Sequence, residues 1–313
     1  MTEIEASSIV EAVQKTISLI DVEGETVSRR VGSWALQKEN SFVRMKELQG
    51  HQITLTNPLA RYHNLLTKGV LAETFDLLHG ENPGIVHLFF PFYNQWRTRG
   101  GLYPYVYGAR LHGWNEEVDQ WSQAVKLLQH DPTTRHALLV IRRPLDIIEN
   151  YQPCSQYAHF QIDSTGRLNL TWTMRSTDTD IGGASRNLFM CSHFLEQMCY
   201  ETGLEMGKVK LYSSNIHIYE TQYEKTMKLL EEFVSAPEPY TKSGLFKTRD
   251  MQTFSMIIQR RYTETEDTEY AISKIENRYF ADWARYLLLS EPKFSFVSEL
   301  SWLLNMKQKK GEE

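Results

Sequence analysis

Three strand-like runs lie close together between residues 137 and 176, and a long apolar helix follows them. The runs ALLVIRR, YAHFQID and LNLTWTMRS are rich in aliphatic and aromatic residues. The turn residues Ser164, Thr165 and Gly166 separate the last two runs and predict a hairpin. Residues 187–201 then repeat apolar side chains at helical spacing and end before Gly203. Strands and helices in this order indicate an α+β fold.

Patterns elsewhere in the chain predict further elements. Residues 4–20 carry Ile9, Val13, Ile17 and Ile20 at helical spacing, which predicts an N-terminal helical extension over residues 1–24. Helices are also expected over 65–78, ended by Gly80, over 115–130 and over EKTMKLLEEFV, whereas HQITLTNP and KVKLYSSNIHIY alternate as strands do. Because no repeat or shift in composition divides the chain, we predict one domain over residues 1–313 with a frayed tail at 306–313.

Charge and cysteine content limit the class of protein. The 34 Lys and Arg against 39 Asp and Glu leave a net charge of −5, which argues against a protein held on nucleic acid by phosphate contacts. No apolar run is long enough for a membrane span, and the acidic start MTEIEASS lacks the basic segment of a signal peptide. Three cysteines without a CxxC pair predict neither a disulfide framework nor a metal site. We therefore expect a cytoplasmic protein.

Cys154 is the candidate nucleophile among the three cysteines. It follows Pro153 at the start of a strand-like run, whereas Cys191 and Cys199 lie on the apolar helix and are expected in the core. The segment RSTDTDIGGASRN, which begins at Arg175, precedes that helix. An arginine close to a thiol favours the thiolate, which is the form that attacks an electrophile.

At these motifs the sequence resembles thymidylate synthases and the related pyrimidine nucleotide hydroxymethylases, from about Arg30 to Tyr219. The resemblance implies a thymidylate synthase-like α+β domain with a mixed sheet that is covered by helices and dimerises through the sheet. It also implies a pyrimidine nucleoside monophosphate as substrate and methylene-tetrahydrofolate as one-carbon donor, without a metal. The implied nucleotide-binding residues are Arg30, Tyr107, Arg135, Arg175, Ser176, Asp178, Asn187, His217 and Tyr219.

The same resemblance gives individual residues their roles. Cys154 adds to carbon six of the base, which makes carbon five a nucleophile toward the one-carbon donor, and Glu73 moves protons as general acid and base. Arg135, in DPTTR, reaches across a homodimer to the partner's phosphate, so the active sites are shared. Tyr93 and Trp96 form the folate shelf.

Several positions depart from the pattern of the synthases. The chain ends in SWLLNMKQKKGEE rather than in a short apolar tail, and Tyr93 replaces the first pocket tryptophan. Ser155, His136 and Met174 replace a histidine, an arginine and a glutamine. Hydride delivery needs the folate to stay stacked on the methylene intermediate, whereas water needs only room and a base. The departures therefore favour a hydroxymethylated product.

Three functions stay open on this reasoning: a nucleotide hydroxymethylase, a divergent thymidylate synthase, and an inactive homologue that binds nucleotide or messenger RNA. Taken alone, Glu73 is more typical of a solvated helix face, and the aromatic block around Trp96 is more typical of core packing. His217 is equally typical of a satisfied, partly buried strand histidine. Asn187 offers both a donor and an acceptor, so cytosine and uracil both fit, and Asp180 is a further acceptor for cytosine. Ribose and deoxyribose are not distinguished.

Overall fold

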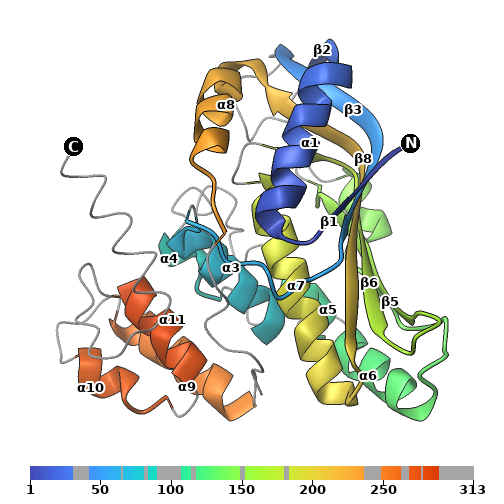
Figure 1. Ribbon diagram of the computed structural model, residues 1–313. Coiled ribbons are helices and arrows are strands. Elements are labelled where there is room, and N and C mark those ends of the chain that lie inside the picture. The colour runs from blue at the N-terminus through green and yellow to red at the C-terminus, as the bar shows by residue number, and fades with distance from the viewer. Residues whose placement is uncertain are drawn as a thin grey trace. The chain divides into compact units, whose positions relative to one another are not determined.

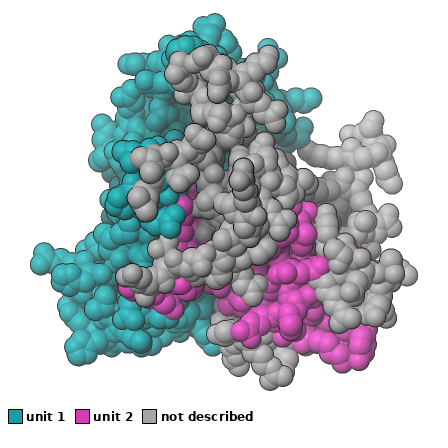
Figure 2. Space-filling view, turned by 180° about the vertical axis from the view of Figure 1, so that it is seen from behind, with its two compact units in different colours: residues 1–65, 120–235 teal, residues 66–119, 236–313 magenta. Residues whose placement is uncertain are grey.

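The computed structural model describes residues 1–30, 42–64, 66–80, 84–89, 107–113, 118–148, 152–179, 183–235, 248–261, 268–275 and 278–288 (Figure 1). The backbone packs into two compact units, which are coloured separately in Figure 2. The first unit comprises residues 1–65 and 120–235, and the second comprises residues 66–119 and 236–313. The single domain over residues 1–313 stays a prediction.

The first unit is built on a mixed sheet of eight strands in the order β1-β3-β8-β6-β5-β4, with β2 also paired to β3 and β7 to β8. The strands are β1 (Thr2–Ala6), β2 (Glu25–Arg30), β3 (Phe42–Leu55), β4 (Leu138–Val140), β5 (Ser155–Ile162), β6 (Leu168–Met174), β7 (Thr177–Asp178) and β8 (Met206–Tyr219). The helices are α1 (Ile9–Glu23), α6 (Gln120–His130), η2 (Pro144–Ile148), α7 (Gly183–Thr202), η3 (Glu220–Gln222) and α8 (Tyr223–Glu231).

Helices α1 and α7 pack on one face of this sheet, where the core of the first unit lies (Figure 1). Alternate side chains of β6, including Leu170 and Trp172, point to this face and are fully buried. Helix α1 buries all four predicted apolar positions, and Ser8 caps its N-terminus by accepting a hydrogen bond from the Glu11 amide. Burial of these apolar stripes holds the helices on the sheet.

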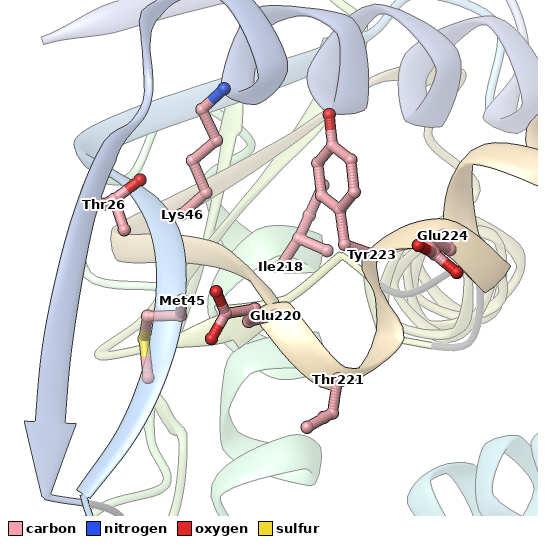
Figure 3. A pocket seen from close by; sticks show the side chains of 8 residues that line it. All are labelled: Thr26, Met45, Lys46, Ile218, Glu220, Thr221, Tyr223 and Glu224. Atoms are coloured by element: carbon pink, nitrogen blue, oxygen red, sulfur yellow. The ribbon is translucent and has the colours of Figure 1, made fainter.

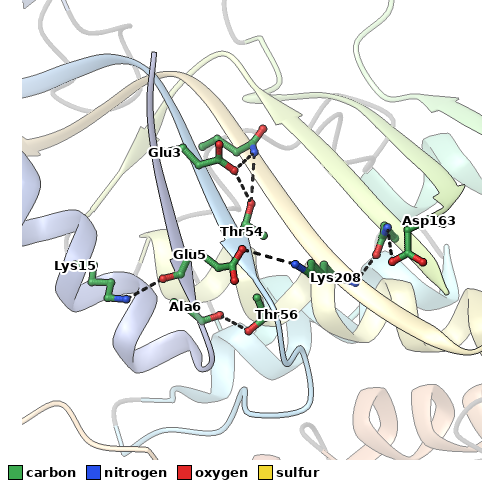
Figure 4. A network of polar contacts seen from close by, with 10 residues as sticks. Glu3, Glu5, Ala6, Lys15, Thr54, Thr56, Asp163 and Lys208 are labelled. Atoms are coloured by element: carbon green, nitrogen blue, oxygen red, sulfur yellow. Dashed lines mark hydrogen bonds and ion pairs between the residues drawn. The ribbon is translucent and has the colours of Figure 1, made fainter. Parts of the chain in front are cut away.

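On β1, the side chains of Glu3 and Glu5 form polar pairs with side chains of other strands (Figure 4). Glu3 accepts hydrogen bonds from Gln52 and Thr54 on β3, and Glu5 forms an ion pair with Lys208 on β8. These pairs follow from the parallel register in which Glu3 lies opposite Gln52. They join the N-terminal strand to the rest of the sheet.

The second unit is helical in its described part. Its helices are α3 (Lys68–His79), α4 (Val86–Phe89), α5 (Tyr107–Leu111), α9 (Thr248–Arg261), α10 (Thr268–Ile272) and α11 (Arg278–Leu288). Gly80 ends α3 in the left-handed region at φ 78°, as predicted, and its amide donates to the Asp76 carbonyl. Tyr286 on α11 donates to the Leu66 carbonyl, so the C-terminal helices pack on the start of α3.

The predicted α+β class, the hairpin of β5 with β6 and the strand β8 are confirmed. The predicted start of the first helix is wrong, because residues 2–6 form an edge strand and the helix begins only at Ile9. Strand β3 begins at Phe42, nine residues before the predicted strand, and α6 begins at Gln120 rather than at 115. Residues 306–313 lie outside the described residues. None of the described helices combines the length and the apolar character that crossing a bilayer requires.

Candidate active site

Cys154 lies directly before strand β5, at the edge of the β5–β6 hairpin. Its carbonyl oxygen accepts a hydrogen bond of 2.8 Å from the amide of Arg175, which follows the last residue of β6. The predicted nucleophile and the predicted phosphate-binding arginine are therefore neighbours across the hairpin. Cys154 is half-buried, whereas the other two cysteines are buried.

The Arg175 guanidinium holds the loop that carries Cys154. Its Nε atom donates to the Pro153 carbonyl at 3.1 Å, and one terminal nitrogen donates to the Gln152 carbonyl at 3.0 Å. Gln156 donates to the carbonyl of Cys154 itself at 3.2 Å. Each of these carbonyl groups belongs to the residues before the strand, so the bonds restrict the backbone on which the thiol is displayed.

Arg142 completes this arrangement from outside the hairpin. Its two terminal nitrogens donate to the side-chain oxygens of Gln152 and Gln156, at 2.5 and 3.4 Å. Arg142 therefore supports the two glutamines beside Cys154.

Ser155, which replaces the histidine of the resembling family, has a packing role here. It is fully buried, and its hydroxyl accepts a hydrogen bond of 2.9 Å from the Trp172 indole. The indole therefore pins the first residue of β5 to β6. A buried serine needs such a partner, because an unpaired hydroxyl in the core costs about 1–3 kcal/mol.

Cys191 and Cys199 lie on α7 and are buried, as predicted. Desolvation raises the pKa of the Cys191 thiol well above its usual value. Desolvation also raises the pKa of the Cys199 thiol to about 12. Both thiols therefore stay protonated at neutral pH, so among the three cysteines only Cys154 is placed for thiolate chemistry.

Asp178 and His217 lie opposite each other where the short strand β7 pairs with β8. The amide and the hydroxyl of Thr179 both donate to the His217 carbonyl, at 2.7 and 2.9 Å. These bonds fix the backbone of His217 relative to the loop after Asp178. The pairing of β7 with β8 and the hydrogen bond between Arg175 and Cys154 therefore bring Arg175, Asp178 and His217 to one end of the sheet, beside Cys154.

The Asp178 carboxylate lies against the first residue of α7. A methyl group added to Gly183 would come within 1.8 Å of Asp178 Oδ1, so only glycine fits at this position. A carboxylate is also favourable at a helix N-terminus, where backbone N–H groups are unpaired. Asn187 was predicted to precede the helix, but α7 begins at Gly183 and Asn187 is a buried residue inside it.

His217 and Tyr219 share one face of β8, as their spacing of two residues predicted. Their rings meet edge to face, with centroids 4.7 Å apart. His217 Nδ1 lies 2.7 Å from Asn215 Oδ1, and the Asn215 amide nitrogen contacts a carboxylate oxygen of Glu47 on β3. A polar chain therefore runs from β3 to His217, which was predicted to bind the nucleotide.

Arg135 and Arg30 were both predicted to bind the nucleotide. Arg135 is exposed just before β4, and its carbonyl lies 3.1 Å from His159 Nε2. His136, which replaces a second arginine, is also exposed. Arg30 ends strand β2 opposite Phe42, and its side chain lies outside the described part of the chain.

Glu73 and Tyr107 belong to the second unit. Glu73 is half-buried on α3, and Tyr107 is half-buried at the first residue of α5. The two helices pack closely. A methyl group added to Gly108 would come within 2.0 Å of the Asp76 carbonyl oxygen, so the absence of a side chain at Gly108 permits this approach. Tyr93, Trp96 and Asp180 lie outside the described residues. Where residues are described, no group of three or more His, Cys, Asp or Glu side chains is arranged to hold a metal ion.

A pocket of about 360 Å³ lies in the first unit beside strands β2, β3 and β8 (Figure 3). It is lined by Thr26, Met45, Lys46, Ile218, Glu220, Thr221, Tyr223 and Glu224. Lys46 and the Tyr223 hydroxyl both contact Asp21 of α1, so they connect helices α1 and α8 with the sheet. Among the residues that the structure describes, none of those predicted for the active site lines this pocket.

Sequence reasoning missed Gln152, Gln156, Asn215 and Glu47. The alternation in SNIHIY places Asn215 on the same face as His217, so this partner had a signal in the sequence. Glu47 had none, because its position opposite His217 depends on how β3 pairs with β8. The two glutamines form hydrogen bonds with backbone carbonyls and side chains of a loop. No rule of residue spacing predicts such contacts.

Comparison with known proteins identifies the class. The sequence profile of the family described as thymidylate synthase matches residues 14–273, so the chain belongs to this family. It is 37% identical over 124 residues to a protein described as "Putative thymidylate synthase" from Methanosarcina acetivorans, which covers 39% of this chain and 56% of that protein. A similar match to Methanosarcina barkeri is 35% identical over 124 residues, with the same coverage.

A phage protein gives the longest of these matches. The chain is 29% identical over 199 residues to the deoxyuridylate hydroxymethyltransferase of Bacillus phage SP01. That match covers 58% of this chain and 52% of the phage protein. The chain thus spans little more than half the length of each of these relatives. The resemblance seen in the sequence motifs is confirmed at the level of the family.

Proposed function

We propose that this protein is a pyrimidine nucleoside monophosphate hydroxymethylase of the CMP, dCMP or dUMP type. It transfers a one-carbon unit from methylene-tetrahydrofolate, the co-substrate of its family, to carbon five of the base. The observation that carries the proposal is the half-buried Cys154 on a loop held by Arg175, next to Asp178 and His217. This arrangement combines a nucleophile with cationic and hydrogen-bonding groups that suit a nucleotide.

In this proposal each residue moves a defined group. The Cys154 thiolate forms a bond to carbon six, and the electron pair displaced from the ring double bond makes carbon five nucleophilic. Methylene-tetrahydrofolate supplies the one-carbon unit to carbon five. Glu73 removes the proton from carbon five, and the bond between the one-carbon unit and the folate nitrogen breaks, which releases tetrahydrofolate and leaves an exocyclic methylene group on the base. Glu73 then orients water toward this methylene group. Addition of water and release of Cys154 give the hydroxymethylated nucleotide, so no oxidation of the folate is required.

The remaining site residues bind the nucleotide. Arg30, Arg135 and Arg175 contact the phosphate, with Ser176, because guanidinium groups bind phosphate oxygens in pairs. Asn187 and Asp178 read the base, Tyr107 lines its pocket, and His217 with Tyr219 holds the sugar. Tyr93 and Trp96 form the folate shelf. The protein is proposed to work in the cytoplasm and without a metal.

A homodimer is part of the proposal. Leu138, Val140, Ile147 and Tyr157 are all exposed on or beside the edge strand β4, and Leu138 and Val140 are each 44% exposed. The exposed Arg135 lies three residues before this strand. Apolar side chains grouped at an edge strand support burial against a second copy, in which Arg135 reaches the partner's nucleotide.

Analysis of the nucleotide product tests the proposal directly. The protein is incubated with methylene-tetrahydrofolate and with each of CMP, dCMP, UMP and dUMP, and the product is weighed by mass spectrometry while dihydrofolate is followed by absorbance. We expect one nucleotide to gain a CH₂O unit without formation of dihydrofolate, and Cys154→Ser to give no product. A methyl product with an equal amount of dihydrofolate would overturn the hydroxymethylase.

A divergent thymidylate synthase is the second candidate. The archaeal relatives described as "Putative thymidylate synthase" favour it, because they are more similar per aligned residue than the phage hydroxymethyltransferase. The hydroxymethylase is preferred because Tyr93 replaces the pocket tryptophan that keeps the folate stacked for hydride transfer. The same product assay separates the two reactions.

A further inference from the structure

One face of strands β2, β3 and β8 carries a chain of polar side chains that ends at His217. In the antiparallel register of β3 with β8, Glu47 lies opposite His217 and Gln49 lies opposite Asn215. Directly opposed residues point to the same face of a sheet, so the four side chains are neighbours. Arg29, on β2, joins them through the Glu47 carboxylate.

Glu47 accepts hydrogen bonds from three side chains among the described residues. Arg29 donates from two nitrogens, Gln49 donates at 3.2 Å and Asn215 donates at 2.6 Å. The side chain is only 1% exposed. Hydrogen bonding to Arg29 lowers the pKa of the Glu47 carboxyl to about 2, so the group is ionised and can only accept near neutral pH.

This carboxylate decides which way the Asn215 amide faces. Only the amide nitrogen of Asn215 can donate to Glu47, so the amide oxygen must face His217 Nδ1, which lies 2.7 Å away. An amide oxygen accepts, and therefore His217 Nδ1 must carry a proton. The reversed amide would place two acceptors together at Glu47, and the other histidine tautomer would place two acceptors together at Asn215.

We propose that Glu47 and Asn215 are positioning residues that hold His217 with its proton on Nδ1, so that Nε2 accepts a hydrogen bond from a sugar hydroxyl of the nucleotide. This inference rests on the proposed function. It adds the direction of the hydrogen bond, in which the nucleotide donates and the protein accepts. Thr179 fixes the His217 backbone, and the Tyr219 ring packs edge to face on the imidazole, so the ring cannot easily turn to compensate.

The inference makes recognition of the sugar depend on residues that do not touch it. A nucleotide without sugar hydroxyls offers His217 no donor and loses one hydrogen bond, which corresponds to roughly tenfold in affinity. If Glu47 and Asn215 set the tautomer, their loss should remove this preference. A purely structural role would weaken both kinds of nucleotide equally.

Calorimetric binding of two nucleotides to four forms of the full chain tests this. The nucleotides are dUMP and its 2′,3′-dideoxy analogue, or the corresponding cytosine pair if the product assay identifies cytosine. The proteins are the wild type, Glu47→Gln, Asn215→Leu and the control Gln49→Ala, which removes a hydrogen bond to Glu47 but leaves Asn215 in place. We expect roughly tenfold preference for the hydroxylated nucleotide in the wild type and control, and a preference of about one in the two variants. Unchanged preference in Glu47→Gln and Asn215→Leu would overturn the inference.

The tautomer itself is measured without any ligand. Long-range proton–nitrogen correlation spectra of protein labelled with ¹⁵N-histidine report which ring nitrogen is protonated, and loss of a signal in His217→Gln identifies His217. We expect the Nδ1–H form in the wild type and in Gln49→Ala, and a mixture of tautomers in the two positioning variants. An Nε2–H form in the wild type would overturn the inference even if nucleotides bind. An Nδ1–H form without nucleotide binding would refute the proposed function and its sugar contact, while leaving the positioning by Glu47 established.

Discussion

The stability of the first unit should fall in mild acid because of His51. This histidine lies on β3 and is fully buried, with Nδ1 at 2.8 Å from the Thr2 hydroxyl and Nε2 at 3.4 Å from the Thr16 hydroxyl. Burial lowers the pKa of His51 from 6.5 to about 4. His51 therefore binds a proton less readily in the folded protein than in the unfolded chain.

The size and sign of the effect follow from this pKa difference. Between about pH 6.5 and pH 4 the unfolded state binds more protons than the folded state, so the free energy of unfolding decreases as pH falls through this window. Each unit of pKa difference corresponds to about 1.36 kcal/mol, so His51 accounts for a loss of at most about 3.4 kcal/mol. At about pH 5 the expected loss is roughly 2 kcal/mol. Above about pH 6.5 the histidine is neutral in both states and the contribution to pH dependence vanishes.

Urea unfolding of the wild type and of His51→Gln, followed by circular dichroism across this pH range, measures the effect. The carboxyl groups titrate in both proteins, so the difference between their free energies isolates His51. We expect this difference to shrink by roughly 2 kcal/mol from neutral pH to about pH 5. His136→Gln, at an exposed position, is the control and should follow the wild type. Parallel curves for the wild type and His51→Gln would refute the assignment.

Three further predictions concern the active site. Cys154→Ser should abolish turnover in the product assay, while nucleotide affinity stays within about tenfold of the wild type. The control Cys191→Ser should keep activity. Turnover by Cys154→Ser would remove this thiol from the mechanism. Mixing Arg135→Ala with Cys154→Ser should restore part of the activity through heterodimers, and confirmed mixed dimers without activity would place the arginine in its own chain's site. Gly183→Ala should lower the free energy of unfolding by about 1–3 kcal/mol and weaken nucleotide binding, because the new methyl group collides with Asp178. An unchanged free energy of unfolding in urea would contradict this contact.

The local elements of the first unit are largely determined by the sequence. Alternation in YAHFQID and LNLTWTMRS and the turn at Gly166 suffice for the β5–β6 hairpin, because its partners are close along the chain. Apolar spacing likewise predicted α1, α3 and α7, although Asn187 lies inside α7 rather than before it. The ordered motifs around Cys154, Arg175 and His217 were sufficient to predict the family.

The long-range pairings were decided only by the tertiary structure. Residues 2–6 were expected to be helical, but they pair in parallel with residues 51–55. The network from Glu47 to His217 likewise joins residues 170 positions apart, through a strand register that no local pattern contains. Helical and alternating patterns depend on neighbours along the chain, whereas the partner of an edge strand or of a buried carboxylate depends on which strands meet. The sequence alone was therefore sufficient to predict Cys154 as the nucleophile and to predict the family, whereas the packed sheet determined which residues contact the side chains beside Cys154.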